Sequence, residues 1–371
     1  MKKTGILIAV LIGLYACKNS NQFKVVATVS GVETDRKVFV RSLNDNNQLV
    51  TIDTLDIKGG TFVYEGTAAL PNIHYFAIQN IRGRIPVVIE PGTIRITAHK
   101  DSLNVAVVTG TPSNVEFGKI TENFKTIVKK MGELRKEMIS ANRAKDSVAI
   151  AKIKDGYRTI QEETLAFQKK FIEENPQSYV SAMLLKQLLF SNAQGISIEE
   201  IQRLYDKLLK SVKATKEAVE VDTQLRKIAT TAIGAVAPGF SGSDPEGNTL
   251  TLEDLKGKAT VIHFWESRCK PCRVQNLNLE ALYSKYHDQG LAIIGVSFDR
   301  KAEQWKKAIA EDKLNWNHIS NLKHFAFDSI AQTYTIKKLP AIFILDAEGK
   351  IVAKNLDGEA LSAQIESLLT P

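Results

Sequence analysis

Residues 259–272 read Ala-Thr-Val-Ile-His-Phe-Trp-Glu-Ser-Arg-Cys-Lys-Pro-Cys, and this stretch decides the fold of the C-terminal part of the chain. The apolar run Ala259–Trp265 has the length and composition of a fully buried strand. The polar residues after it end the strand, and a helix is predicted over Lys270–Asp288. The sequence therefore predicts a strand that leads directly into a helix, with Cys269 and Cys272 at the junction.

The spacing of these two cysteines is typical of thiol–disulfide chemistry. Two intervening residues let the sulfurs close a small ring, and the N-terminus of the helix stabilises the thiolate of Cys269. Pro271 gives up no useful hydrogen bond in the first helical turn. Arg268 and Lys270 flank Cys269 and are expected to lower the pKa of its thiol further. We therefore predict that Cys269 attacks a substrate disulfide and that Cys272 resolves the mixed disulfide.

Two other interpretations of the cysteine pair stay open at this point. A zinc site would need four ligands, and the chain has no second Cys-x-x-Cys pair to supply the other two. A static structural disulfide also fits the spacing, although closing so short a loop stabilises a fold little. The redox interpretation is therefore favoured.

Beyond the cysteines, strands and helices alternate. Strands are predicted at Leu291–Ser297, Ala341–Leu345 and Lys350–Ala353, and helices at Ala302–Asp312, Asp328–Tyr334 and Ser362–Leu369. This mixed α/β order predicts a central sheet covered by helices.

Several motifs of this region recur together in one known family. They are Ala237-Pro238-Gly239-Phe240, Phe264-Trp265, Cys269-x-Pro271-Cys272 and Leu339-Pro340-Ala341-Ile342-Phe343-Ile344-Leu345-Asp346. With them, residues 237–371 resemble the thioredoxin-fold domain of TlpA/ResA-type proteins, which are membrane-tethered, extracytoplasmic thiol–disulfide oxidoreductases. The resemblance implies a catalytic site of Cys269, Cys272, Pro271, Trp265 and Pro340, and no cofactor or metal. It makes Pro340 a cis-proline whose preceding backbone pairs with a substrate strand, whereas local physics alone also allows an ordinary proline at a strand start.

Two positions depart from the family pattern. Three residues after Cys272 the family usually has a glutamate that is thought to assist proton transfer, and here the residue is Gln275. On the strand before Trp265, thioredoxins place a buried aspartate, and here the residue is His263. A histidine titrates near the working pH and could replace the missing base. The alternative is a buried neutral histidine that only fills space.

The sequence upstream of residue 233 predicts two further regions. Residues 23–110 carry short alternating runs separated by turn residues, which predict an antiparallel β-sandwich or barrel. Residues 111–232 carry apolar residues at steps of three and four, which predict a helical region. Its apolar stripes either pack on neighbouring helices or form a homodimer. This part of the chain is also similar to lipoproteins that join an uncharacterised β-domain to the oxidoreductase, and residues 233–371 then form the thioredoxin-like domain.

The N-terminus is interpreted as a signal peptide, residues 1–17. A short basic start precedes the apolar run Gly5–Ala16, which is too short to span a bilayer. The following Cys17 resembles the lipidated cysteine of a bacterial lipobox, and the alternatives are a plain secretory signal or an uncleaved anchor. We expect a protein lipid-anchored in the envelope of a Gram-negative bacterium and facing the periplasm. Its expected partners are thiol- or disulfide-bearing envelope proteins, among them those of cytochrome c-type biogenesis, and a membrane electron donor or acceptor.

The composition excludes other classes of protein. The chain has 371 residues and a net charge of +8, with its basic residues spread along the whole sequence, which argues against nucleic-acid binding. A peroxiredoxin would need a proline and a threonine upstream of its reactive cysteine, and residues 264–268 supply neither. The remaining alternative is an envelope binding or scaffolding module in which the redox site is accessory or a relic.

Overall fold

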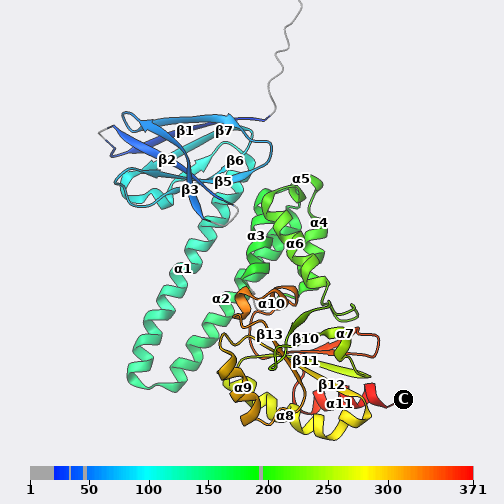
Figure 1. Ribbon diagram of the computed structural model, residues 1–371. Helices are drawn as coiled ribbons and strands as arrows, with labels where there is room; N and C mark the ends of the chain where they lie inside the picture. Colours follow the sequence, from blue (N-terminus) through cyan, green and yellow to red (C-terminus); the bar gives the residue numbers. More distant parts are fainter. Residues whose placement is uncertain (1–20, 33–34, 45–47, 192–194, 371) are drawn as a thin grey trace, which may run out of the picture. The chain divides into compact units, whose positions relative to one another are not determined.

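A computed structural model describes residues 21–32, 35–44, 48–191 and 195–370 of the chain (Figure 1). The chain divides into two compact units, with the boundary between Asp222 and Thr223. In chain order it is β-rich, then helical, then mixed α/β, as predicted. Within the described ranges no helix is both long and apolar enough to cross a membrane. The predicted signal peptide, with Cys17, lies outside the described residues.

The described residues of the β-rich region form eight strands in two sheets. One sheet has the order β4-β1-β7-β8 and the other the order β3-β2-β5-β6. Alternate residues point inward, so that Val25, Val40, Phe76 and Ile94 share one core between the sheets. The strands are β1 Gln22–Ser30, β2 Arg36–Leu43, β3 Leu49–Ile57, β4 Thr61–Thr67, β5 Asn72–Ile78, β6 Ile85–Ile89, β7 Gly92–His99 and β8 Val107–Thr109.

One strand pair differs from the predicted antiparallel arrangement. β1 and β7 run parallel, with Val25 opposite Ile94, whereas the other pairs of this region are antiparallel. Between these two strands the chain forms the whole second sheet and β4, and it returns in the original direction. The alternation of buried and exposed residues along a strand cannot reveal this pairing, because it is the same whether the neighbouring strand runs parallel or antiparallel.

The helical region follows directly, with β8 ending at Thr109 and α1 beginning at Pro112. Buried polar contacts fix the start of α1 to the sandwich. Asn114 exchanges two hydrogen bonds with the backbone of Val88, at 2.7 and 3.0 Å, and the Glu90 carboxylate accepts bonds from the Ser113 amide and hydroxyl, at 2.9 and 2.6 Å. The helices are α1 Pro112–Ala144, α2 Ser147–Glu174, α3 Tyr179–Phe190, α4 Ile198–Lys207, α5 Lys210–Lys213 and α6 Lys216–Ala229.

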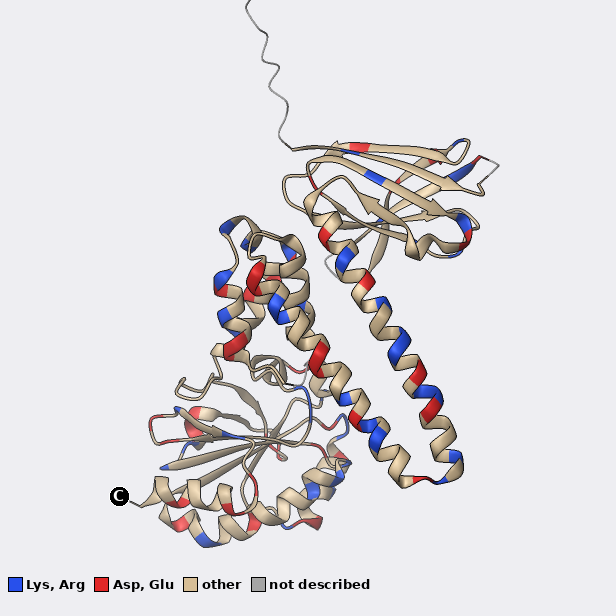
Figure 2. Cartoon of the chain, turned by 180° about the vertical axis from the view of Figure 1, so that it is seen from behind, with Lys and Arg blue, Asp and Glu red and all other residues tan. Residues whose placement is uncertain are grey.

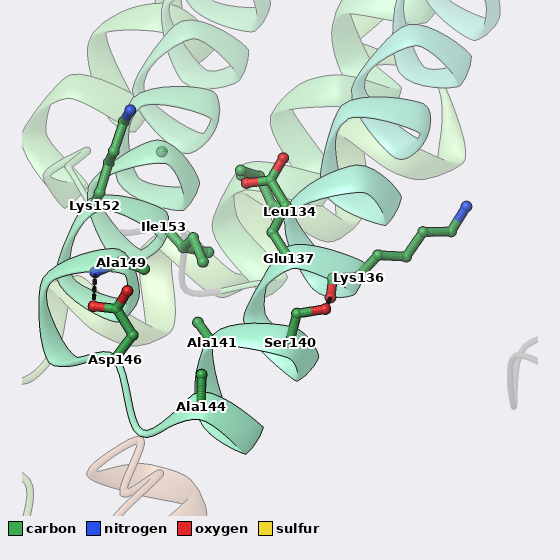
Figure 3. Close-up of a pocket in the computed structure, with 11 residues that line it drawn as sticks. Leu134, Lys136, Glu137, Ser140, Ala141, Ala144, Asp146, Ala149, Lys152 and Ile153 are labelled. Atoms are coloured by element: carbon green, nitrogen blue, oxygen red, sulfur yellow. Dashed lines mark hydrogen bonds between the residues drawn. The ribbon is translucent and has the colours of Figure 1, made fainter.

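The helices α1 and α2 form a hairpin that turns at Lys145, whose φ is +53°. Basic and acidic residues are interspersed along both helices (Figure 2). Leu134, Ala141 and Ile153 line a hollow of about 710 Å³ between them (Figure 3). Val148 is exposed, which leaves apolar surface on the hairpin. The predicted homodimer through this region stays a prediction.

The C-terminal unit is built on a mixed sheet with the order β10-β9-β13-β12-β11-β14-β15. β11, β12 and β13 are parallel to one another, and β14 is antiparallel to β11. The strands are β9 Ser241–Ser243, β10 Thr249–Thr251, β11 Ala259–Trp265, β12 Leu291–Ser297, β13 Asn317–Ser320, β14 Ala341–Leu345 and β15 Ile351–Lys354, and the helices are α7 Leu252–Leu255, α8 Lys270–Tyr286, α9 Ala302–Glu311, α10 Ser329–Thr333 and α11 Gly358–Leu369.

Both faces of this sheet are covered, because every residue of β11 is buried. On one face, Val261 and Trp265 pack with Cys272 of α8 and with residues of α9 and α11. On the other face, Ile262 and Phe264 pack with residues of α10. The predicted strands β11, β12 and β14 are confirmed to the residue, while α11 begins four positions before the predicted Ser362. The thioredoxin-like arrangement predicted from the sequence is confirmed.

Candidate active site

The two cysteines lie at the junction of β11 and α8. Cys269 is the N-cap of α8, and its sulfur accepts a hydrogen bond of 3.2 Å from the Cys272 amide. The two residues form a disulfide, with their Cα atoms 5.2 Å apart. Cys269 is partly exposed, whereas Cys272 is completely buried against Trp265 and Leu279. Of the two sulfurs, the one at Cys269 is therefore the one that a substrate can reach.

The residues that flank Cys269 in the sequence also lie around it in the structure. Arg268, Lys270 and Pro271 are exposed around Cys269, and Pro271 stands in the first turn of α8. The peptide bond between Leu339 and Pro340 is cis, as the family resemblance implies. Leu339 packs against the same apolar cluster as Cys269. The proline therefore precedes β14 at the edge of the sheet that carries the cysteines.

A buried carboxylate that sequence reasoning missed anchors the loop before Cys269. Asp299 accepts hydrogen bonds from the Ser267 amide at 2.9 Å, from the Ser267 hydroxyl at 2.5 Å and from the Ser297 hydroxyl at 2.9 Å. The carboxylate is only 4% exposed, so these donors replace its water. The sequence did contain a signal for Asp299, because it follows shortly after the buried strand β12. The carboxyl ends of parallel strands meet at one edge of a sheet, and this edge also carries Cys269.

A second missed group fixes the start of α8. The Arg273 guanidinium binds both carboxylate oxygens of Asp312, the residue after α9, and also contacts Glu311 at 3.1 Å. The Asn276 amide donates to the same Asp312 carboxylate at 2.9 Å. These hydrogen bonds raise the pKa of Arg273 above its usual value. The charge of Arg273 is thus used inside the fold and is not offered to a substrate.

A layer of aromatic rings lies in the sheet below the cysteines. His263 and Trp265 project from the same face of β11, and their rings stack with an angle of 12° between planes. His318 of β13 lies 5.8 Å from the Trp265 ring, measured between centroids. Gly295 of β12 leaves the room for these rings, because a Cβ atom there would lie 2.3 Å from the His318 ring.

Burial determines the protonation of His263. Loss of water around the ring, together with the nearby His318, lowers the pKa of His263 to about 3. Burial likewise lowers the pKa of His318 to about 3. His263 is therefore neutral at neutral pH, and the reason given for a base role, titration near the working pH, does not hold in the oxidised protein. The structure favours the alternative in which this histidine is a packed, neutral ring.

Gln275 lies in α8 and is buried, with its amide nitrogen lacking a hydrogen-bond partner among the described residues. An amide cannot accept the proton that a carboxylate would take at this position. Gln275 thus supplies no base, and the base role predicted for His263 stays a prediction. Within the described ranges no group of three or more His, Cys, Asp and Glu side chains could hold a metal ion.

Two family models match separate parts of the chain. Residues 233–354 match the AhpC/TSA family, and residues 23–117 match a domain of unknown function, DUF4369. The chain is 34% identical over 140 residues to the thiol-disulfide oxidoreductase ResA of Bacillus cereus, a match that covers 37% of this chain and 76% of that protein. It is 33% identical over 121 residues to the thioredoxin-like protein YneN of Bacillus subtilis, covering 32% of this chain and 68% of that protein.

Solved structures match a similar share of the chain. The thioredoxin domain of a thiol-disulfide oxidoreductase from Bacteroides vulgatus is 41% identical, with a TM-score of 0.35, and the match covers 38% of this chain and 99% of that one. The C-terminal domain of a putative thiol-disulfide oxidoreductase from Bacteroides thetaiotaomicron is 34% identical, with a TM-score of 0.36, and covers 38% of this chain and 97% of that one.

Proposed function

The chain belongs to the ResA family of thiol-disulfide oxidoreductases, and from this premise we propose that it exchanges disulfides with envelope proteins through Cys269 and Cys272 while a lipid on Cys17 holds it at a membrane. The observation that supports this most is the asymmetry of the pair. One sulfur is accessible at a helix N-cap, and the other is buried one turn later.

In the direction of substrate reduction, the exchange takes place in two thiol–disulfide steps. The Cys269 thiolate attacks one sulfur of a substrate disulfide, which forms a mixed disulfide and releases the other substrate sulfur as a thiolate. Cys272 then loses its proton and attacks the Cys269 sulfur, which releases the second substrate sulfur. The protein ends as the Cys269–Cys272 disulfide, having given two electrons, and the two substrate thiolates take up two protons. The reverse sequence oxidises a substrate dithiol.

The local structure favours the charged form of Cys269. The Cys272 amide already donates to its sulfur, and the N-terminal end of α8 carries the partial positive charge of the helix dipole. The Asp299 carboxylate holds the loop at Ser267, and Arg273 holds the following turn. Because these anchors fix both sides of Cys269, its sulfur is presented in one position to an incoming disulfide.

The replacement Cys272→Ala tests this function directly. Without the resolving thiol, reduced protein should form a mixed disulfide through Cys269 that persists. Insulin serves as a defined disulfide substrate, and mass spectrometry under non-reducing conditions should detect an adduct that dithiothreitol removes. The matched control is Cys269→Ala/Cys272→Ala, which should form none. An adduct in the double variant, or none in the single variant, would contradict the assignment.

The second candidate function is a binding or scaffolding module with an accessory redox site. Gln275 in place of the family's glutamate, and the large β-rich and helical unit, favour it. Insulin turnover separates the two functions. A folded wild-type protein that neither reduces insulin nor is trapped on it supports the module, whereas turnover supports the oxidoreductase.

The lipid anchor rests on Met1-Lys2-Lys3, the short apolar core and Ala16-Cys17, with the remainder of the chain then facing the periplasm of a Gram-negative envelope. We expect the full chain to incorporate labelled fatty acid and to fractionate with membranes, and Cys17→Ala to lose the label. Equal labelling of both proteins would overturn the anchor. The clients, which on the family resemblance include proteins of cytochrome c-type biogenesis, and the membrane electron donor or acceptor stay predictions.

A further inference from the structure

The topology of the C-terminal sheet brings four loops to the edge that carries the cysteines. β11, β12 and β13 are parallel, and their last residues Trp265, Ser297 and Ser320 stand in register. β14 is antiparallel to β11, with Ala341 opposite Phe264, so its beginning lies at the same edge. The loops after β11, β12 and β13 and the loop before β14 therefore surround Cys269.

These loops and the first residue of α8 are rich in exposed basic side chains. We call the following set the cationic rim: Arg268, Lys270, Arg300, Lys301, Lys323, Lys337 and Lys338. The acidic residues of the same loops offset it little. Asp299 is buried and bound to Ser267 and Ser297, and only Glu266 of the loop before Cys269 is partly exposed.

Most of the cationic rim has no internal counter-ion. Arg268, Lys270, Arg300 and Lys301 form no ion pair with any acid among the described residues. Arg273, one turn into α8, shows the contrast, because Asp312 and Glu311 neutralise it. Exposed like charges gathered on one edge repel one another, and they create a positive potential at the place where a substrate must approach.

Part of the rim also lines a recess. The basic side chains Arg268, Arg300 and Lys301 line a hollow of about 410 Å³ beside the loop that carries Cys269, together with Glu266, Phe298, Asp299, Gln304 and His324. Its walls come from the loops after β11, β12 and β13 and from α9. The walls carry three basic and two acidic side chains, and a recess of this size accommodates one or two carboxylate side chains of an extended segment.

We propose that the cationic rim is a substrate-selecting surface that binds an acidic segment next to the reactive cysteine of the client protein. The proposal rests on the proposed function of Cys269 and deepens it by naming a chemical class of client. Carboxylates of the client accept hydrogen bonds from Arg268, Arg300 and Lys301, while its disulfide lies over the Cys269 sulfur. Because the charges are exposed, the gain is mainly in the rate of encounter, and it is screened by salt.

Three synthetic peptides test this proposal. Each carries one cysteine, in a mixed disulfide with 2-mercaptoethanol, and the flanking residues are Glu, Gln or Lys. Reduced protein transfers two electrons to each peptide disulfide, which yields the oxidised protein, the peptide thiol and 2-mercaptoethanol. Because flanking charges change the intrinsic reactivity of the peptide, each rate is divided by the rate of the same peptide with dithiothreitol. We expect the normalised rate of the Glu peptide to exceed that of the Gln peptide by about fivefold or more at low salt. In 1 M salt the difference should fall to within about twofold.

Two double variants with reversed charges test whether the preference for the Glu peptide depends on the cationic rim. Arg300→Glu/Lys301→Glu should abolish the preference for the Glu peptide over the Gln peptide. The control is Lys258→Glu/Lys350→Glu, because both lysines are exposed and lie at the opposite end of the sheet, where β11 and β15 begin. It should retain the preference.

The outcomes separate the two levels of the proposal. Equal normalised rates for the Glu and Gln peptides, or an equal loss of preference in both double variants, overturn the cationic rim and leave the oxidoreductase function standing. Failure to react with all three peptides contradicts the proposed function itself, and the rim proposal falls with it.

Discussion

Gly295→Ala should destabilise the C-terminal unit by about 1–3 kcal/mol, which is the range for overpacking a tightly packed interior. The added Cβ would lie 2.3 Å from His318 Nδ1, 2.8 Å from His318 Cε1 and 3.2 Å from Trp265 Nε1. His318 is almost entirely buried between Trp265 and Trp316, so its ring has no free space to move into. The glycine is therefore required for volume and not for its backbone angles.

Tryptophan fluorescence during urea unfolding of the full chain measures this effect. All three tryptophans of the protein, Trp265, Trp305 and Trp316, lie in the C-terminal unit, so the signal reports on that unit alone. Gly239→Ala is the matched control, because nothing lies within 4 Å of a Cβ there. Coincident unfolding midpoints for Gly295→Ala and wild type would contradict the packing argument.

The sequence was most informative where burial is continuous. The sequences of β11, β12 and β14 are predominantly apolar, and strands that are buried on both faces show such near-continuous apolar runs whatever their neighbours in the sheet. β13 was missed because it is only Asn317–Ser320, and its one apolar residue, Ile319, gives no periodic signal. Its position is fixed instead by pairing with β12.

The cysteine pair and the cis-proline were identified because they form a short local motif or a family motif. Asp299 and the Arg273–Asp312 pair were not, because their partners lie more than thirty residues away in the sequence. The protonation of His263 was also beyond local reasoning. Residue type suggests titration near neutral pH, whereas complete burial beside His318 lowers the pKa to about 3. Only the packed structure shows which of these two influences prevails.

Cys269→Ser should lower disulfide exchange by at least roughly 100-fold, because a serine hydroxyl is far less ionised than a thiol and forms no disulfide. Cys272 cannot take over, since its side chain is completely buried. The fold should persist, because serine is a good N-cap and its oxygen can accept the Cys272 amide bond now made by the Cys269 sulfur.

Insulin reduction measures the loss of exchange, and circular dichroism with urea unfolding checks the fold. The reference for stability is wild type reduced with dithiothreitol, because the variant has no disulfide and oxidised wild type would add the effect of that bond. Suppose that the variant unfolds at the same urea concentration as reduced wild type but retains more than about a tenth of the wild-type activity. The nucleophile would then not be Cys269. Loss of activity with an unchanged midpoint places the chemistry on this one sulfur, because the helix it caps and the loop that Asp299 holds are then still in place.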